Sequence, residues 1–129
     1  KISFIMLGDI YNIKFIIPNI GEAEGELIRI KGPHLTELIS RSLPINSRGL
    51  VREDMFVIPI NVLYATEKPT NSGKRGDIVY EPNSKALIIL LADKKFDRKI
   101  ANIGSISEKL EIFDELKQSS GVRIARIED

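Results

Sequence analysis

The chain has 129 residues, of which 43% are hydrophobic, so it can form one well-buried core and is short for two. Its 19 lysine and arginine residues nearly balance its 18 aspartate and glutamate residues, and a net charge of +1 lacks the basic excess typical of nucleic-acid-binding proteins. Because cysteine is absent, a disulfide framework, a thiol nucleophile, an iron–sulfur cluster and the usual structural zinc site are excluded. We expect a single domain, 1–129, without metal or cofactor.

The N-terminal apolar run, residues 2–7, is broken by Gly8 and Asp9. It is too short for a membrane span or for the apolar region of a signal peptide, so we expect a cytoplasmic protein that does not associate with membranes. Isoleucine supplies about one residue in six, tryptophan is absent and 29% of residues are charged. This archaeal or thermophile-like composition is frequent in proteins from hot habitats.

Residues 10–17 and 22–30 alternate apolar and polar side chains, which predicts two strands separated by a turn at 18–21. The second strand places three carboxylates on one face, those of Glu22, Glu24 and Glu26. A cation site there is the alternative, but hard cations need ligands that converge from several segments. We interpret this face as solvated.

The spacing of apolar residues predicts a helix over 33–42, because Pro33 suits the first helical position and Pro44 ends the segment. His34, which is the only histidine, falls in the first turn. A metal ligand or general base would need partners, and the chain holds no second histidine and no cysteine. We therefore expect a surface histidine.

The segment 46–54 is polar and predicts a loop, whereas 55–64 alternates and predicts a strand. Pro59 within that strand implies an edge or a bulge, since proline cannot complete the hydrogen-bond ladder. A strand-mediated dimer could form there, or residues 2–7 could fold back onto the same place within one chain. We expect a monomer or a weak homodimer, and an exposed loop over 67–75.

Residues 76–92 are the stretch around which the rest of the predicted fold is organised. Residues 78–80 are strand-prone, Pro82, Asn83 and Ser84 form a turn, and 86–91 are apolar without alternation. A strand of that kind is covered on both faces, by a closed barrel or by helices.

The segment 93–99 surrounds Phe96 with charge. The cations could contact nucleic acid with Phe96 as a stacking platform, through Lys94, Lys95, Arg98 and Lys99. Two aspartates dilute that charge, so we favour a solvated loop in which Phe96 turns inward, and we expect no nucleic-acid partner.

The C-terminal part predicts a strand over 100–106, a helix over 106–118 and a last strand over 122–127. Ser105 and Glu108 have the spacing of a capping box at the start of that helix. The complete order predicts a mainly β protein, a closed and mostly antiparallel barrel with two capping helices. We expect the core to contain Phe15, Ile28, Leu38, Ile58, Ile60, Leu87, Ile89, Leu110, Phe113 and Ile124.

The stretch GDIVYEPNSKALIILL, followed by NIGSISEKLEIFDELKQSSGVRIARIE, resembles the cyclophilin-like barrels. It is most similar to a small prokaryotic family of unknown function, and the segment from Gly32 to Pro44 resembles that family's first helix and its exit. The chain departs from the family at 49–52, where an Asn-x-Trp-Gly segment is usual, at the turn 81–84, and at Ala101, where a polar residue is usual. The resemblance therefore implies the family's barrel with a rebuilt pocket.

The resemblance also bears on activity, because prolyl isomerases share this barrel. Arg48 or Arg52 approximates their catalytic arginine, while Ala86 and Ile88 replace their glutamine and phenylalanine, and Phe96 corresponds to their pocket tryptophan. We name no catalytic residue and expect no efficient catalysis. The alternative is a peptidyl-prolyl cis-trans isomerase that uses Arg48 or Arg52.

The sequence thus predicts a binding module for a peptide or small ligand, which would bind in an open cleft on the barrel. The candidate contacts are cationic or aromatic residues near the segments that shape the cleft in the resembled fold: Arg52, Phe56, Tyr80 and Phe96. Phe56 and Tyr80 could instead belong to the core, and Arg52 could pair with Glu53 or Asp54.

Overall fold

The computed structural model describes residues 9–127. In this range the chain forms β1 (Ile10–Ile17), β2 (Gly21–Ile28), the 3-10 helix η1 (Arg29–Lys31), α1 (Pro33–Ser42), β3 (Ile45–Arg52), β4 (Met55–Pro59), β5 (Thr70–Gly73), β6 (Asp77–Glu81), β7 (Ala86–Leu90), β8 (Lys94–Glu108), the 3-10 helix η2 (Leu110–Glu115) and β9 (Ser119–Arg126).

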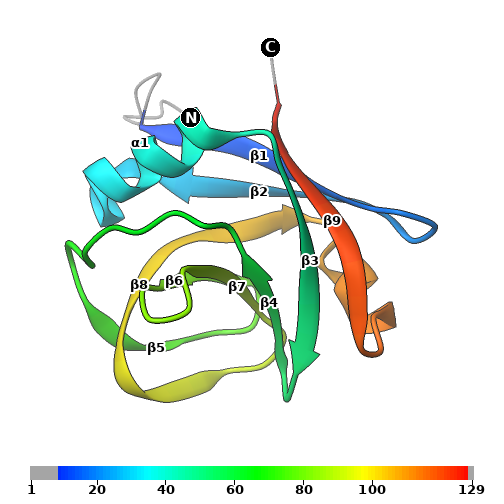
Figure 1. Cartoon of the computed structure of the whole chain (residues 1–129). Helices are drawn as coiled ribbons and strands as arrows, with labels where there is room; N and C mark the ends of the chain where they lie inside the picture. The colour runs from blue at the N-terminus through cyan, green and yellow to red at the C-terminus, as the bar shows by residue number, and fades with distance from the viewer. Residues whose placement is uncertain (1–8, 128–129) are drawn as a thin grey trace, which may run out of the picture.

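The strands close into an antiparallel barrel (Figure 1). The hydrogen-bonded order is β2-β1-β9-β3-β4-β7-β6-β8, and β8 returns to pair with β2. Strand β5 lies outside this ring and pairs with the first part of β8. The predicted fold class, a mainly β closed barrel, is confirmed.

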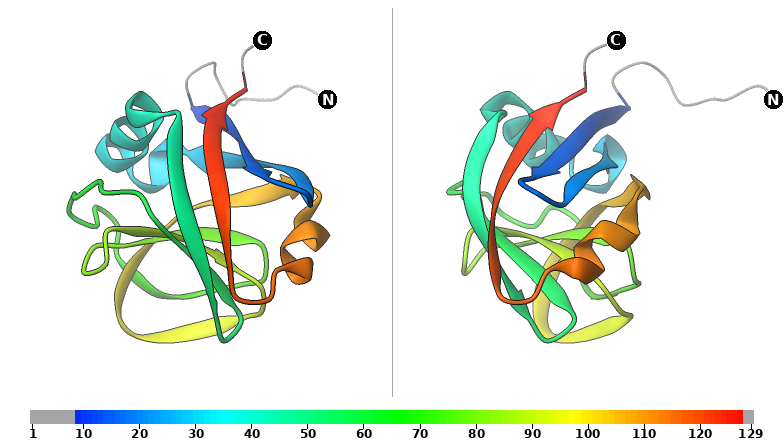
Figure 2. Two further views of the ribbon diagram at one scale, coloured as in Figure 1. Left: turned by 45° about the vertical axis from the view of Figure 1, so that its right-hand side comes forward. Right: turned by 90° about the vertical axis from the view of Figure 1, so that its right-hand side faces the viewer.

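The core fills the barrel and is covered by residues from the helical segments. Leu35 and Ile39 of α1 are fully buried in it, because they lie four residues apart on one helical face. From η2, Phe113 packs against Phe15 and Phe56, with both ring-centroid distances at 5.9 Å. In both views of Figure 2, α1 covers the upper part of the barrel and η2 lies lower down.

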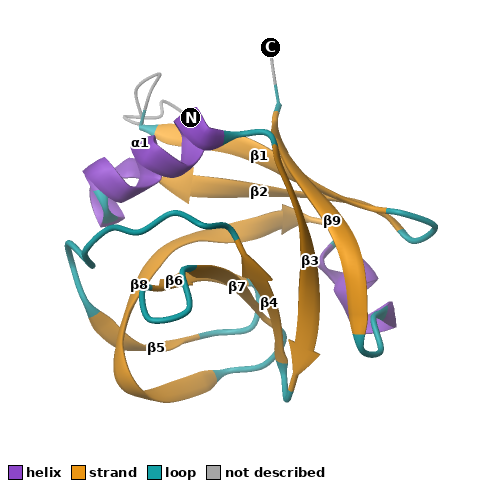
Figure 3. Cartoon of the chain, viewed as in Figure 1, coloured by secondary structure: helices purple, strands orange, loops and turns teal. Residues whose placement is uncertain are grey.

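The second predicted helix, 106–118, is wrong in type and extent (Figure 3). Strand β8 continues to Glu108, and only the six residues of η2 are helical. The reason is tertiary: residues from Gly104 to Glu108 pair with β2 and complete the barrel, which overrides the local capping-box pattern. Lys109 then turns the chain with a φ of 67°.

The loop predicted over 46–54 is also wrong, because Ile45–Arg52 is a strand that pairs with β9 and β4. The alternation of apolar and polar residues that would indicate this strand is missing, because its buried middle position is Gly49 rather than a large apolar residue. The Phe56 ring of the neighbouring strand fills the space there: a Cβ built on Gly49 would lie 2.3 Å from Phe56 Cζ.

Three further boundaries differ from the prediction. The strand predicted over 55–64 is shorter, because β4 ends at Pro59 and residues 60–69 form the connection to β5. Strand β5 itself lies within the loop predicted over 67–75. Pro59 is exposed at the strand's end, beyond the residues of β4 that pair with β3, so its missing N–H leaves no gap in that ladder. The segment predicted as the loop 93–99 is the start of β8, with Phe96 inward as expected.

Seven of the ten predicted core residues are buried: Phe15, Ile58, Ile60, Leu87, Ile89, Phe113 and Ile124. Leu38 and Leu110 are partly buried and pack against the core. Ile28 is only partly buried, at the end of β2.

The strand predicted over residues 2–7 lies outside the described residues, and the dimer that depends on it stays a prediction. Between residues 9 and 127, no helix is long and apolar enough to cross a bilayer.

Candidate functional site

A cleft of about 650 Å³ lies on the outer surface of the barrel over β3, β4 and β7. We call it the outer cleft. Its apolar floor comes from Met55, Val57 and Ile88, and Leu50 stands at its edge, 43% exposed. Its polar lining is Arg52, Glu53, Glu81, Ser84 and Arg98.

Strand alternation explains how the floor becomes apolar. In β4, Phe56 and Ile58 face the barrel core, so Met55 and Val57 face outward. Strand β7 is buried along its whole length, with Leu87 in the barrel core and Ile88 in a second cluster outside it. The prediction that this strand is covered on both faces is confirmed.

The second cluster consists of Val79, Ala86, Ile88, Leu90, Phe96 and Ile100, with Met55 and Val57 packed against it. The first part of β8 supplies Phe96, which is 5% exposed. Because its ring is buried here, it is not available as a platform on which a nucleic-acid base could stack.

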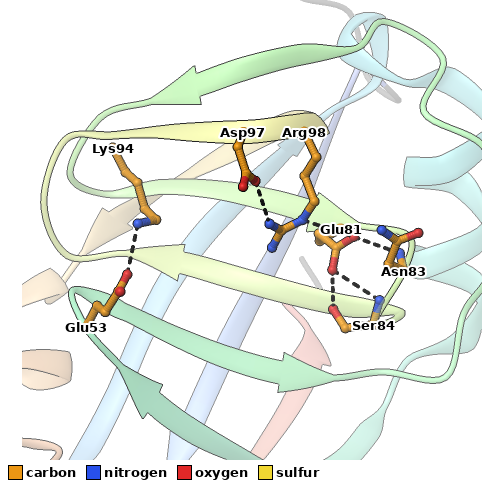
Figure 4. A network of polar contacts seen from close by, with 7 residues as sticks. All are labelled: Glu53, Glu81, Asn83, Ser84, Lys94, Asp97 and Arg98. Carbon is orange, nitrogen blue, oxygen red and sulfur yellow. Dashed lines mark hydrogen bonds and ion pairs between the residues drawn. The ribbon is translucent and has the colours of Figure 1, made fainter.

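Glu81 is the buried charge of the site (Figure 4). Its side chain accepts hydrogen bonds from the backbone N–H groups of Asn83 (2.8 Å) and Ser84 (3.1 Å) and from Ser84 Oγ (2.7 Å). Arg98 Nε lies 3.6 Å from Glu81 Oε2. The carboxylate therefore organises the turn between β6 and β7 and also holds a cleft arginine.

Burial alone would raise the pKa of Glu81, because it penalises the charged form. The hydrogen bonds from Ser84 and Asn83 and the nearby Arg98 outweigh burial, so the pKa is lowered. Glu81 is therefore an ionised, satisfied anion at neutral pH rather than a proton donor.

Two cations flank the Phe96 ring from the same side of β8. Lys94 Nζ lies 5.6 Å and Arg98 Cζ 5.9 Å from the ring centroid. Lys94 also forms an ion pair with Glu53 at 3.0 Å, and Arg98 one with Asp97 at 3.1 Å (Figure 4). The cations suggested as nucleic-acid contacts are thus partly committed to neighbouring carboxylates.

The structure separates the four predicted contacts. Arg52 lines the outer cleft, and Phe96 packs in the apolar cluster beneath it, with the guanidinium group of Arg98 over its ring. Phe56 and Tyr80 are completely buried in the barrel core, which is the alternative that the sequence left open for both. The Tyr80 hydroxyl donates to the Val62 carbonyl and accepts from the Tyr64 N–H.

Arg52 does not pair with Glu53 or Asp54. Within residues 9–127 its side chain makes no hydrogen bond or ion pair, since Glu53 instead binds Lys94. Arg48 is exposed on β3 but does not line the cleft. Arg52 is therefore the uncommitted cation of the site.

The sequence did not identify Glu81 as a site residue, and it singled out Arg98 only as a possible nucleic-acid contact. A recognisable signal existed for Glu81, since a carboxylate directly before Pro-Asn-Ser can accept from the turn that follows. No pattern placed Arg98 beside Glu81, because that arrangement depends on the pairing of β6 with β8. Within the described range, no group of three histidine or acidic residues could hold a metal ion, and Glu22 and Glu24 are exposed on β2.

Comparison with known proteins shows which family this barrel belongs to. The profile described as the cyclophilin-like family matches residues 33–128. The chain belongs to the cyclophilin-like family. That confirms the resemblance drawn from the central stretch and the C-terminal segment.

Two solved structures share the fold. The hypothetical protein AF2241 from Archaeoglobus fulgidus is 20% identical, with a TM-score of 0.78 over 92% of this chain and 96% of that one. McbB, solved in complex with tryptophan, is 18% identical, with a TM-score of 0.75 over 91% of this chain. The chain spans less than half of McbB, 45% of its length. No curated protein matches the sequence.

Proposed function

We propose that this cyclophilin-like domain is a binding module whose outer cleft takes a peptide or small molecule with an apolar group beside a carboxylate. The observation that carries the proposal is Arg52, a cation without a partner among residues 9–127, at an apolar cleft whose other charges are paired. A ligand carboxylate would supply the charge-assisted, bidentate partner that Arg52 lacks.

The size and lining of the outer cleft support a small ligand or one or two residues of a peptide. A volume of about 650 Å³ falls within the usual range of ligand sites. Met55 and Val57 are partly buried, so an apolar group that covers them removes further apolar surface from water.

Tryptophan is a suitable first probe because it joins a large apolar group to a carboxylate. The neighbour McbB was solved with this amino acid. We would titrate the protein with N-acetyltryptophan and with its carboxamide, and follow the Met55 methyl and the Arg52 Nε–H resonances by NMR. We expect saturable shifts at both groups, with clearly weaker binding of the uncharged carboxamide.

Two matched arginine variants test the role of Arg52. Arg52→Gln should weaken binding of N-acetyltryptophan about tenfold, whereas Arg48→Gln, on the same strand outside the cleft, should leave it unchanged. Equal effects of the two variants, or no shift at Met55 with either ligand or with short apolar peptides, would overturn the proposal.

The second candidate function, peptidyl-prolyl isomerisation, is favoured by the same arginine. Arg52 rather than Arg48 lines the cleft, so Arg52 would polarise the prolyl amide nitrogen of a bound peptide. The uncatalysed barrier is about 18–20 kcal/mol, so modest acceleration is measurable in a protease-coupled peptide assay. A rate equal to the uncatalysed one at micromolar protein would rule this function out for simple peptides.

A further inference from the structure

A second cavity, of about 920 Å³, lies between η1, β5 and the starts of β6 and β8. We call it the lysine pocket, because five lysines line it together with two aspartates and one asparagine: Lys31, Lys68, Lys74, Lys94, Lys95, Asp77, Asp93 and Asn102. It shares no lining residue with the outer cleft. The ion pair between Lys94 and Glu53 joins a lining residue of one to a lining residue of the other.

The lysine pocket concentrates positive charge on a nearly neutral chain. Its five lysines exceed its two aspartates by three charges, against a net charge of +1 for the whole protein. Lys94 is paired with Glu53, but the side chains of the other four lysines have no ion pair within residues 9–127. Clustered like charges raise the local concentration of anions.

The floor of the pocket holds acceptors. Asp77 Oδ2 accepts hydrogen bonds from the Lys74 N–H (2.9 Å) and from Asn102 Nδ2 (2.8 Å). Since the carboxylate can only accept, it fixes the orientation of the Asn102 amide. Asn102 Oδ1 is then buried without a partner in the described part of the chain, and such an unsatisfied acceptor is rare in folded proteins.

The strand geometry explains why Asn102 faces the pocket. Its neighbours Ala101 and Ile103 are both buried in the barrel core, so Asn102 projects to the outside of β8. Position 73 has no room for a side chain, because a Cβ there would lie 2.5 Å from Leu90 Cδ1, and it would also crowd Asp77 Oδ2 (3.3 Å) and Asn102 Nδ2 (3.5 Å).

We propose that the lysine pocket binds a sugar phosphate, with the phosphate on the unpaired lysines and the sugar hydroxyls on Asp77 and Asn102. A phosphate monoester carries about two negative charges near neutral pH, which matches the local excess of lysine better than a single carboxylate does. Sugar hydroxyl groups would donate to the Asp77 carboxylate, which lines the pocket and can accept more than the two hydrogen bonds that it has. Ile30, 71% exposed, forms an apolar wall beside these hydroxyl groups.

The test uses ribose 5-phosphate as the probe, with ribose and inorganic phosphate as its two halves. The readout is the side-chain amide of Asn102 and the backbone amides of β5, observed by NMR at low ionic strength. We expect saturable shifts of the Asn102 amide with ribose 5-phosphate, weaker effects of phosphate and none of ribose. If phosphate alone reproduces the affinity and the Asn102 shift, the sugar-binding role is overturned. No saturable shift at millimolar ribose 5-phosphate overturns the site.

Matched lysine variants separate this pocket from general surface charge. The double variant Lys31→Gln/Lys74→Gln should weaken ribose 5-phosphate binding about tenfold or more. The control Lys14→Gln/Lys117→Gln removes the same charge from β1 and from the segment after η2, and should change affinity little. Equal weakening in both would show non-specific attraction and overturn the proposal. Arg52→Gln should leave this binding intact, so the proposal fails or succeeds separately from that of the outer cleft.

Discussion

Glu67 Oε2 lies 2.7 Å from His34 Nδ1, across 33 residues of sequence. The same carboxylate accepts hydrogen bonds from the backbone N–H groups of His34 (2.9 Å) and Leu35 (2.8 Å). The residue before α1 is Gly32, which has no side chain to cap the helix, so a loop residue caps it instead. This single side chain fixes the long connection after β4 against α1.

Replacing Glu67 should therefore loosen two segments. We expect Glu67→Ala to lower the free energy of unfolding by about 1 kcal/mol, the usual cost of losing a helix cap. Urea denaturation measures this, and backbone hydrogen exchange should rise in α1. The control Glu37→Ala removes a carboxylate of α1 that lies 3.8 Å from Arg41 on the surface, and should change stability by a few tenths of a kcal/mol.

The same cap should make stability depend on pH. Burial raises the pKa of Glu67, but the hydrogen bonds from Leu35 and His34 outweigh it and lower the pKa overall. A group with a lowered folded-state pKa stabilises the fold above its unfolded pKa, about 4.3, and loses that contribution as the pH falls through the folded value. The stability difference between wild type and Glu67→Ala should therefore be present at neutral pH and shrink below about pH 4. A difference that grows in acid would contradict this assignment.

Gly49 and Phe56 form a packing pair that a methyl group should disrupt. A Cβ at position 49 would lie 2.3 Å from Phe56 Cζ, and the Phe56 ring also contacts Phe113 in the core. We expect Gly49→Ala to destabilise the protein by about 1–3 kcal/mol. Gly121→Ala is the matched control on the adjacent strand, since nothing lies within 4 Å of its Cβ, and it should be neutral or slightly stabilising.

Tyr80 should behave as a structural residue rather than a ligand contact. Its hydroxyl joins β6 to the loop through Val62 and Tyr64, and burial, opposed by the Tyr64 hydrogen bond and reinforced by the charge of Glu81, raises its pKa. Tyr80→Phe leaves the Val62 carbonyl and Tyr64 N–H without this partner, which should cost about 1–3 kcal/mol. Binding of N-acetyltryptophan should be unchanged at a temperature where the variant is folded. A variant of full stability with weakened binding would return Tyr80 to the site.

Glu81 should contribute to stability through the turn that it organises. In Glu81→Gln one carboxylate oxygen becomes an NH₂ group, which cannot accept, so either the Asn83 N–H, which donates to Oε2, or the Ser84 N–H, which donates to Oε1, loses its acceptor. We expect a loss of about 1–3 kcal/mol, measured by denaturation. Because the pKa of Glu81 is lowered, this loss should be full at neutral pH and diminish in acid. A pH-independent loss would indicate that packing alone is responsible.

The elements that the sequence predicted well are those whose burial follows their own periodicity. Strand β1 and helix α1 were predicted with their boundaries, because their apolar residues repeat at two and at three to four positions. Strand β3 was missed because the residue that fills its inward position, Phe56, belongs to β4. The helix after Ser105 was predicted wrongly because the pairing with β2 is invisible in the local sequence.

The site residues also divide into those that the sequence could identify and those whose position depends on strand pairing. Arg52 was identified because it is a cation near the segments that shape the cleft in the resembled fold. It is free of Glu53 because Glu53 pairs with Lys94, 41 residues further along the chain from Glu53. Phe56 and Tyr80 were candidates because they are aromatic and lie near the segments that shape the cleft in the resembled fold, and their burial follows from barrel closure. Glu81 and Arg98 become neighbours only when β6 and β8 pair.

The pairing of β1 with β9 has a consequence for biosynthesis. Phe15 is the register partner of Ile124, so the first described strand completes its ladder with the last. A chain that grows from its N-terminus on the ribosome cannot close this barrel until β9 has been made and released. Until then β1 keeps one edge without its native partner, and such an edge can pair with another chain. We expect nascent chains that stop before Ser119 to remain open and sensitive to protease, and the complete chain to become resistant in a single step.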